Sequence, residues 1–154
     1  MAIRTGRESL LGNNLLLLVE DNPDDEELML AAMRQNRVPA RVVTVRDGQE
    51  ALDWLFGQGD YGERDTTVQP RVILLDLKLP KRSGHEVLAG IRNDPRTRRV
   101  PVVVLTSSDE ESDKVRAYDL AANSYVVKPV NFDSFLRVAS HLGRYWLTVN
   151  ETPG

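Results

Sequence analysis

Two short stretches of the chain are apolar at every position. Leu15 to Val19 and the V-I-L-L run from Val72 to Leu75 contain only large aliphatic residues. A strand with one exposed face would alternate between apolar and polar side chains, whereas a parallel strand covered on both faces is apolar throughout. We therefore interpret both stretches as buried parallel strands, and the second as the central strand of a sheet.

Strands and helices alternate along the rest of the chain. Further strands are predicted over Arg41 to Arg46, Val100 to Leu105 and Ser124 to Val127. Helices are predicted over Pro23 to about Gln35, Gly48 to Phe56, His85 to Asn93, Glu110 to Leu120 and Asn131 to about Leu147. Because crossovers between parallel strands are right-handed, this fivefold β-α order predicts a doubly wound α/β fold with a parallel sheet.

Three segments fall outside this alternation. Residues 1–14 are expected to be a flexible lead-in and residues 148–154 a short tail. The segment from Gly57 to Pro70 is polar and rich in glycine, so it is interpreted as a surface loop. One domain over residues 15–147, with no effector domain, is therefore expected.

Composition mainly excludes possibilities. The 154 residues, 41% hydrophobic and 28% charged, suit one globular domain with a sizeable core. A net charge of −3 gives no general reason to bind nucleic acid or an anionic membrane, and no partner of either kind is expected. The absence of cysteine excludes disulfides, thiolate metal sites and thiol nucleophiles. Leu15 to Val19 is too short to span a bilayer, and a cytoplasmic protein is expected.

Polar side chains follow four of the predicted strands. Asp76 ends the central strand, where a charge is costly to bury without a partner and where open α/β sheets bind ligands. Glu20 and Asp21 follow the first strand, Thr106 the fourth and Lys128 the fifth. Any one of these could be a loop cap or a surface ion pair. Five on one edge of the sheet predict a functional site.

The residue types at this edge favour phosphoryl chemistry. Three close carboxylates repel one another and would protonate or recruit a cation, and an oxygen-only set favours Mg²⁺. The ammonium of Lys128 and the hydroxyl of Thr106 suit charge neutralisation and hydrogen bonding of a phosphoryl group. Asp76 is the carboxylate best placed to act as the nucleophile and form an aspartyl phosphate.

At these residues the sequence resembles the receiver domains of two-component response regulators. Thr106, Tyr125 and Lys128 stand 30, 49 and 52 residues after Asp76, which matches the family's hydroxyl, aromatic and lysine positions. The resemblance covers about Leu15 to Leu147. It implies a flavodoxin-like (βα)5 sheet with the strand order 2-1-3-4-5.

The resemblance also implies a role for each site residue. Asp76 would be the phosphoacceptor, and it would ligate Mg²⁺ together with Asp21 and the backbone carbonyl of Lys78, while Glu20 acts through a water. Thr106 and Lys128 would bind the phosphoryl oxygens, and Tyr125 would be the ring that rotates inward when Thr106 moves. The bond between Lys128 and Pro129 would be a cis peptide.

A narrower resemblance comes from the loop at Gly57 to Pro70 and several motifs. The loop is longer than in most receivers. Together with D-G-Q-E-A-L-D-W-L, L-P-K-R-S-G-H-E-V-L, P-V-V-V-L-T-S-S and the late Y-W pair, it is similar to single-domain regulators that pair with phytochrome histidine kinases. This implies a sensor histidine kinase, a phytochrome, as the partner. Output would pass through protein contacts, without enzymatic activity beyond self-catalysed phosphotransfer and autodephosphorylation.

The last predicted helix has a wider apolar arc than one contact requires. The arc spans roughly 200°, and a helix on one face of a sheet needs about half of that. We expect a two-fold dimer through this helix, joined by the helix at Glu110 to Leu120 and the strand at Ser124 to Val127. The expected interface residues are Val138, Leu142, Tyr145, Trp146 and Val149. The alternative is that the tail folds back over this surface.

Two other functions remain open at this point. One is a phosphorylation-independent interaction module on the same fold. The other is a phosphatase of the haloacid dehalogenase type, which needs a second acid two residues after its nucleophile, where this chain has Lys78. His85 and His141 are interpreted as surface residues, and Trp54 as a packing residue.

Overall fold

The computed structural model describes residues 14–153. The lead-in predicted for residues 1–13 lies outside this range. Asn14, which we placed in the lead-in, belongs to the fold: it is buried, and its carbonyl accepts a hydrogen bond of 2.9 Å from the Arg41 amide. Within the described residues, none of the helices is both long and apolar enough to cross a bilayer.

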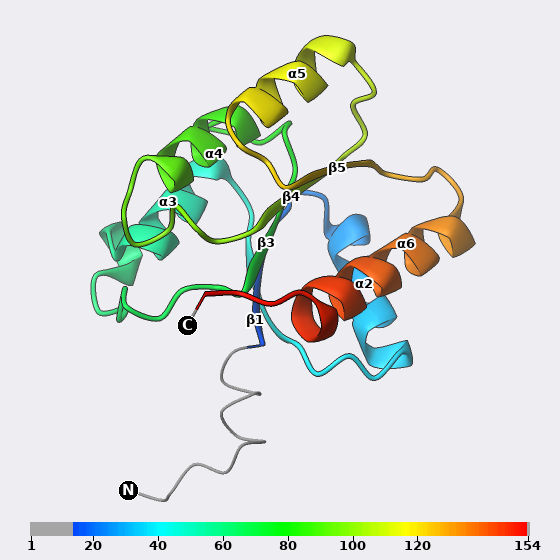
Figure 1. The fold of residues 1–154 in the computed structure, drawn as a ribbon. Coiled ribbons are helices and arrows are strands. Elements are labelled where there is room, and N and C mark those ends of the chain that lie inside the picture. Colours follow the sequence, from blue (N-terminus) through cyan, green and yellow to red (C-terminus); the bar gives the residue numbers. More distant parts are fainter. Residues whose placement is uncertain (1–13, 154) are drawn as a thin grey trace, which may run out of the picture.

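Five parallel strands form one sheet in the order β2-β1-β3-β4-β5, which confirms the predicted topology (Figure 1). The strands are β1 (Leu15–Val19), β2 (Arg41–Val45), β3 (Val72–Leu75), β4 (Val102–Thr106) and β5 (Ser124–Val127). Every residue of the three central strands is buried, whereas the edge strands β2 and β5 are partly exposed. The fully apolar runs in the sequence are therefore the strands with helices on both faces.

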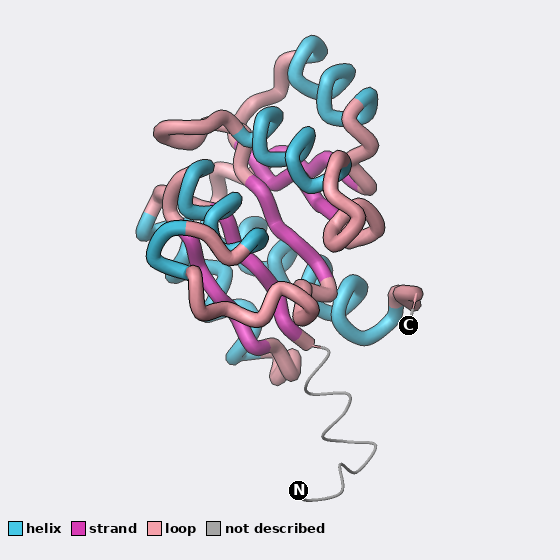
Figure 2. Tube along the Cα trace, turned by 90° about the vertical axis from the view of Figure 1, so that its left-hand side faces the viewer, coloured by secondary structure: helices cyan, strands magenta, loops and turns pink. Residues whose placement is uncertain are grey.

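The helices lie in two layers. On one face are α2 (Pro23–Gln35) and α6 (Phe132–Arg144), and on the other are α3 (Gly48–Phe56), α4 (Gly84–Arg92) and α5 (Glu111–Asp119). Figure 2 looks onto the side that carries α3, α4 and α5. Strand β1 serves both layers, because Leu15 and Leu17 point toward α3 and α4 while Leu16 and Leu18 point toward α2 and α6.

The loop between α3 and β3 is more regular than predicted. It contains a short 3₁₀-helix, η1 (Gly59–Tyr61), and it is fastened to α3 by Arg64. The Arg64 guanidinium donates to the carbonyls of Trp54 and Leu55 and stacks 3.7 Å from the centre of the Trp54 ring. Trp54 is buried, which confirms its interpretation as a packing residue.

The last helix is not one continuous α-helix, contrary to our prediction. It ends at Arg144 and continues as a π-helix, η2 (Tyr145–Val149), in which the Asn150 amide bonds to the Tyr145 carbonyl at 2.7 Å. The Thr148 hydroxyl donates to the Arg144 carbonyl and competes with the backbone for it. A π-turn holds more residues than an α-turn, so the uniform angular spacing behind the predicted apolar arc does not apply beyond Arg144.

Candidate functional site

The carboxylates predicted at the strand ends lie together. Glu20 and Asp21 follow β1 and Asp76 follows β3, and one carboxylate oxygen of each lies within 4.8 Å of the others. Glu20 and Asp76 are buried, while Asp21 is exposed. The neighbouring strands β1 and β3 are parallel and in register to Val19 and Leu75, so their carboxyl ends bring the acids to one point.

Lys128, which follows β5, supplies the positive charge of the site. Its Nζ lies 2.6 Å from Glu20 Oε1 and 2.8 Å from both Asp76 Oδ2 and Asp25 Oδ2. All three donors of the ammonium therefore have a carboxylate partner. The predicted cis peptide before Pro129 is wrong, because residues 14–153 contain no cis bond. Lys128 reaches the acids with a trans bond to Pro129, and its amide donates to the Thr106 carbonyl at 2.7 Å.

Asp25 is a carboxylate partner of Lys128 that we did not predict from the sequence. Asp25 lies in the first turn of α2, which Asn22 caps by accepting from the amides of Asp24 and Asp25. Acidic residues are favoured in any first turn because of the helix dipole, so the sequence offered no reason to separate Asp25 from Asp24. The contact with Lys128 becomes visible only once β5 and α2 are placed in space.

The burial of these groups changes their protonation. Burial raises the pKa of Glu20 to about 7, although the hydrogen bond and charge of Lys128 act in the opposite direction. Burial alone would lower the pKa of Lys128, but its hydrogen bonds to Asp25, Asp76 and Glu20 outweigh that effect and raise it. Lys128 therefore stays a charged ammonium at neutral pH. Glu20 in the metal-free site binds a proton more readily than an ordinary glutamate does.

Thr106 and Tyr125 lie on the next two strands. We expected Thr106 just after the fourth strand, but it is the last residue of β4, whereas Tyr125 lies within β5 as predicted. Thr106 is fully buried at the end of β4, and its Oγ1 accepts a long 3.4 Å hydrogen bond from the Ser108 amide. The Tyr125 hydroxyl donates to the Ser108 carbonyl at 3.0 Å, and its ring is half-buried. Both residues therefore contact the loop that follows β4. The rotation of Tyr125 remains a prediction.

The loop after β3 adds the remaining contacts to Asp76. The Lys78 amide donates to Asp76 Oδ1 at 3.2 Å, whereas the role of its carbonyl as a cation ligand remains a prediction. Gly84 begins α4 directly against this loop, and a Cβ there would lie 2.3 Å from the Asp76 carbonyl oxygen. Only glycine therefore lets α4 begin so close to the phosphoacceptor candidate.

Two hollows lie at opposite ends of the sheet. The larger, of about 1000 Å³, is lined by residues that precede the strands, among them Asn14, Arg71 and Pro101, and holds none of the clustered carboxylates. The smaller, of about 540 Å³, is lined by Asp21, Lys78 and His85 among others. Chemistry rather than size therefore marks the site, because ligands of open α/β sheets bind at the carboxyl ends of the strands.

His85 corrects one interpretation of the sequence. We expected a surface residue, but His85 is buried at the start of α4, with Nε2 3.2 Å from the Asp113 carbonyl oxygen on α5. The cause is the packing of α5 over α4, which the sequence pattern of α4 alone does not show. His141 is exposed, as expected.

The clustered acids fit a hard divalent cation. Three carboxylates supply oxygen ligands without nitrogen or sulfur, and two of them are buried, where uncompensated negative charge is costly. A bound Mg²⁺ would supply positive charge against the oxygens of a phosphoryl group. The site thus has an aspartate that lies beside a lysine within an acidic cluster, at the carboxyl edge of a five-stranded flavodoxin-like sheet. This arrangement defines the class of domains that accept a phosphoryl group on aspartate.

Comparison with known proteins gives the family. The family model described as the response regulator receiver domain matches residues 16–140, and the chain belongs to this family. It is 43% identical over 141 residues to the probable methanogenesis regulatory protein FilR2 of Methanothrix harundinacea, covering 91% of this chain and 88% of the relative. It is 36% identical over 139 residues to the response regulator Rcp1 of Synechocystis, covering 90% and 92%.

Solved structures show the same fold. The phosphorylated cyanobacterial phytochrome response regulator RcpA aligns with a TM-score of 0.85 and 41% identity over 92% of this chain and 99% of that chain. The Mn²⁺-bound form of Rcp1 aligns with a TM-score of 0.85 and 35% identity over the same shares. The bacteriophytochrome response regulator RtBRR is 48% identical, with a TM-score of 0.71 over 91% and 84%. Receiver domains bind Mg²⁺ or Mn²⁺ at their acidic site and accept a phosphoryl group on an aspartate.

Proposed function

We propose that Asp76 is the phosphoacceptor of this response regulator. The observation that carries the proposal is the position of its carboxylate, which is buried at the end of the central strand, 2.8 Å from Lys128 and within the acidic cluster. Glu20 and Asp21 would complete the Mg²⁺ site, with the carbonyl of Lys78. Thr106 and Lys128 would receive the phosphoryl oxygens.

The reaction needs few groups from the protein. An Asp76 oxygen forms a bond to the phosphorus of a kinase phosphohistidine, the phosphorus–nitrogen bond breaks, and the imidazole nitrogen keeps the electron pair and takes a proton from solvent. Lys128 stabilises the charge on the transferred group because its ammonium already faces the Asp76 oxygen. Phosphorylation then shifts the population of two conformations. Thr106 would move toward the new phosphoryl group, and the Tyr125 ring would rotate inward.

The direct test is intact mass after incubation with a small phosphodonor such as acetyl phosphate, with and without Mg²⁺. Wild type should gain one phosphoryl group only when Mg²⁺ is present, and Asp76→Asn should gain none. Asp119→Asn is the matched control, because it removes an exposed carboxylate at the end of α5 that is not a member of the acidic cluster. No adduct on wild type, or an equal adduct on Asp76→Asn, would favour the phosphorylation-independent interaction module.

We infer that the phosphodonor is a sensor histidine kinase of the phytochrome class. The support is similarity to RcpA and RtBRR, which are described as phytochrome and bacteriophytochrome response regulators. Phosphotransfer from a phosphorylated bacteriophytochrome should be faster than transfer from an unrelated histidine kinase at equal concentration. Equal rates would remove the support for a phytochrome partner. A location in the cytoplasm, where such kinases present their phosphohistidine, belongs to the same proposal.

We propose no turnover beyond self-catalysed phosphotransfer and autodephosphorylation. Phosphatases that use an aspartyl nucleophile need a second acid two residues later, and that position is Lys78, whose amide bonds Asp76.

Output would instead use a homodimer. Exposed apolar residues lie at both ends of α6 and on neighbouring elements: Val115, Tyr118, Val127, Val130, Phe132, Tyr145 and Val149.

The dimer proposal has particular support at the end of α6. Tyr145 is 47% exposed and Val149 is 60% exposed, although both belong to an otherwise apolar helical surface. Val138, Leu142 and Trp146 are half-buried, and the last two also pack against the chain's own core. Residues 151–153 line the larger hollow, which lies at the amino-terminal ends of the strands. The tail therefore leaves Tyr145 and Val149 free for a second copy.

A further inference from the structure

We propose that Asp25 is a positioning residue for phosphoryl transfer, which holds the Lys128 ammonium toward Asp76 when a cation occupies the acidic cluster. The inference rests on the proposed function, because it assigns a second carboxylate to the site at which Asp76 accepts the phosphoryl group. It starts from a contact of 2.8 Å between Asp25 Oδ2 and Lys128 Nζ, between residues that are 103 positions apart in the sequence.

The three carboxylate partners of Lys128 are not equivalent. Glu20 and Asp76 belong to the cluster whose oxygens could hold a metal ion, together with Asp21. Asp25 contacts Lys128 at the same distance as Asp76 but is not a member of that cluster. Among the described residues that contact the ammonium, Asp25 is therefore the partner that a cation leaves free.

The charge balance explains why this partner is needed. The Lys128 side chain is only 9% exposed, so solvent contributes little to the stabilisation of its charge. With a divalent cation bound in the acidic cluster, Glu20 and Asp76 would neutralise the cation rather than Lys128, and the ammonium would lose part of its stabilisation by them. Asp25 then supplies the remaining negative charge next to Lys128, and it keeps the ammonium beside Asp76 for the incoming phosphoryl oxygens.

Asp25 is held firmly enough to act in this way. Its backbone amide bonds to the Asn22 side chain at 3.2 Å, and Pro23 fixes the first helical position of α2. The side chain therefore projects from a capped helix end rather than from a loop, and a rigid element positions a functional group more accurately. Asp24 stands beside it with the same charge and the same cap, but it is exposed.

Asp24→Asn is therefore the matched control for Asp25→Asn. Both variants remove one negative charge from the first turn of α2, so they change the helix dipole interaction equally. Only Asp25→Asn changes the contact with Lys128. Asp25→Glu keeps the charge on a longer side chain and serves as the conservative variant.

The first experiment measures the rate of phosphoryl uptake from acetyl phosphate at saturating Mg²⁺, by intact mass. Asp25→Asn should react about tenfold more slowly than wild type, the effect of one charge-assisted hydrogen bond, and Asp24→Asn should stay within about twofold. Asp25→Glu should recover part of the rate. Mg²⁺ affinity by calorimetry should change by less than about threefold in Asp25→Asn, because Asp25 is outside the cation cluster.

The second experiment asks whether Asp25 acts through Lys128. In a Lys128→Met background, Asp25→Asn should produce no further loss of rate. Without metal, Asp25→Asn should lower the free energy of unfolding more in the wild-type background than in Lys128→Met, because only the former has the ion pair. Denaturant titrations of the four proteins measure this coupling.

Four results would overturn the positioning role, and the first of them would also overturn the proposed function. If wild type takes no phosphoryl group, the proposed function fails, and the positioning role fails with it. If wild type is phosphorylated and Asp25→Asn reacts like Asp24→Asn, the function stands and the positioning role is overturned. A loss of rate that persists undiminished in Lys128→Met, or a fall in Mg²⁺ affinity as large as the fall in rate, would also overturn it.

Discussion

The charge at the proposed phosphorylation site is arranged around one side chain, Lys128. Glu20, Asp25 and Asp76 share its ammonium, so the cation cluster in the metal-free protein is already partly neutralised. Binding of Mg²⁺ must therefore separate Lys128 from at least part of its carboxylate partners. Under the proposed mechanism, the lysine would compete with the cation before phosphorylation and stabilise the phosphoryl group during it.

This competition predicts that Lys128→Met binds Mg²⁺ more tightly than wild type. Removing the ammonium leaves buried carboxylates without a counter-ion, and the affinity should rise by about tenfold or more. Calorimetric titration in low-salt buffer measures the change. Lys114→Met is the control, since Lys114 pairs only with Asp109 at the surface and should leave the affinity unchanged. An unchanged or weaker affinity in Lys128→Met would show that the lysine does not compete.

Glu20 predicts how Mg²⁺ binding depends on pH. Burial raises its pKa to about 7, so below that pH the proton competes with the cation, and above it the carboxylate is free. The apparent affinity should fall by up to about tenfold per pH unit below pH 7 and level off above it. Calorimetry from about pH 6 to about pH 8 measures this, and Glu20→Gln should flatten the curve. The same slope in Glu20→Gln would assign the proton to another group.

Most residues of the candidate site could be predicted from the sequence, but not all of them. Glu20, Asp21, Asp76 and Lys128 could be found because strand ends in a parallel sheet converge, and the structure brings them together. Asp25 could not be found, because a carboxylate in a first helical turn has a sufficient local explanation. His85 was misjudged for the corresponding reason, since its burial depends on a neighbouring helix that its own sequence pattern does not describe.

Among helices and strands, the predicted bounds agree with the structure where local sequence signals alone determine where the element begins and ends. Helix α2 runs over the predicted residues, because Asn22 and Pro23 are strong start signals. Strand β1 matches for the same kind of reason, since its fully apolar run has sharp ends. The π-helix η2, in which the Thr148 hydroxyl donates to the Arg144 carbonyl, was missed because a regular helical period cannot predict a π-turn.

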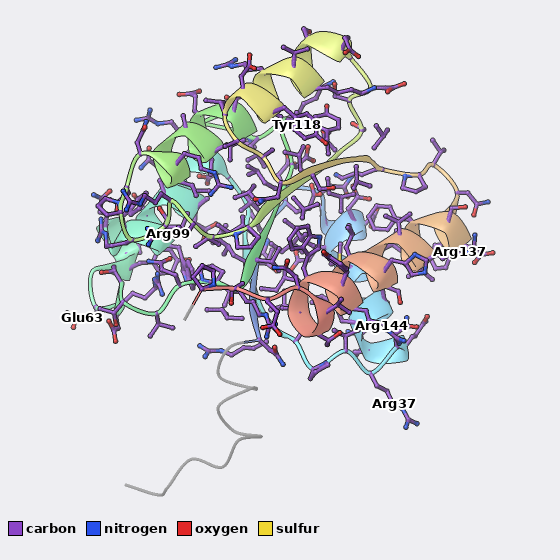
Figure 3. All side chains as sticks on the ribbon, in the orientation of Figure 1. Arg37, Glu63, Arg99, Tyr118, Arg137 and Arg144 are labelled. Carbon is purple, nitrogen blue, oxygen red and sulfur yellow. The ribbon has the colours of Figure 1, made fainter. Side chains whose placement is uncertain are left out.

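The loop between α3 and β3 gives a prediction about stability. Arg64 donates to the carbonyls of Trp54, Leu55 and Val68 and stacks on the Trp54 ring. Arg64→Ala should therefore lower the free energy of unfolding by about 2 kcal/mol, measured by denaturant titration. Glu63 is its exposed neighbour at the margin of the molecule (Figure 3), and Glu63→Ala should change stability by less than about 0.5 kcal/mol.

Phosphoryl uptake should not change in Arg64→Ala, because the loop precedes β3 and lies away from the carboxyl edge of the sheet. An Arg64→Ala protein as stable as Glu63→Ala would show that the loop is held by other contacts. A loss of phosphoryl uptake with normal stability would instead connect the loop to the site.

At the level of the whole molecule, the fold followed from the alternation of strands and helices, while assembly did not. The strand order needed only right-handed crossovers and a resemblance whose residues converge on one edge. The apolar surface of the last helix is wider than one contact requires, and part of it faces the chain's own core, where Leu147 of η2 is buried. What remains exposed is Phe132 at the start of α6 and the pair Tyr145 and Val149 in η2.

The proposed dimer predicts the effect of a charge at this surface. Val149→Glu should convert a wild-type dimer at micromolar concentration into a monomer, because it places two like charges across a two-fold axis. Light scattering coupled to size-exclusion chromatography measures the mass. Val68→Glu is the control, since Val68 is similarly exposed, at 46%, on the loop before β3. A monomeric wild type, or dissociation by both variants, would contradict this interface.

Locating the modified residue shows whether Asp76 receives the phosphoryl group. Protein treated with acetyl phosphate and Mg²⁺ is reduced with borohydride, which converts an acyl phosphate on aspartate to homoserine, and its peptides are sequenced by mass spectrometry. We expect homoserine at position 76 alone, and none when Mg²⁺ is omitted. Homoserine at another aspartate, or none in a protein that gains phosphoryl mass, would contradict it.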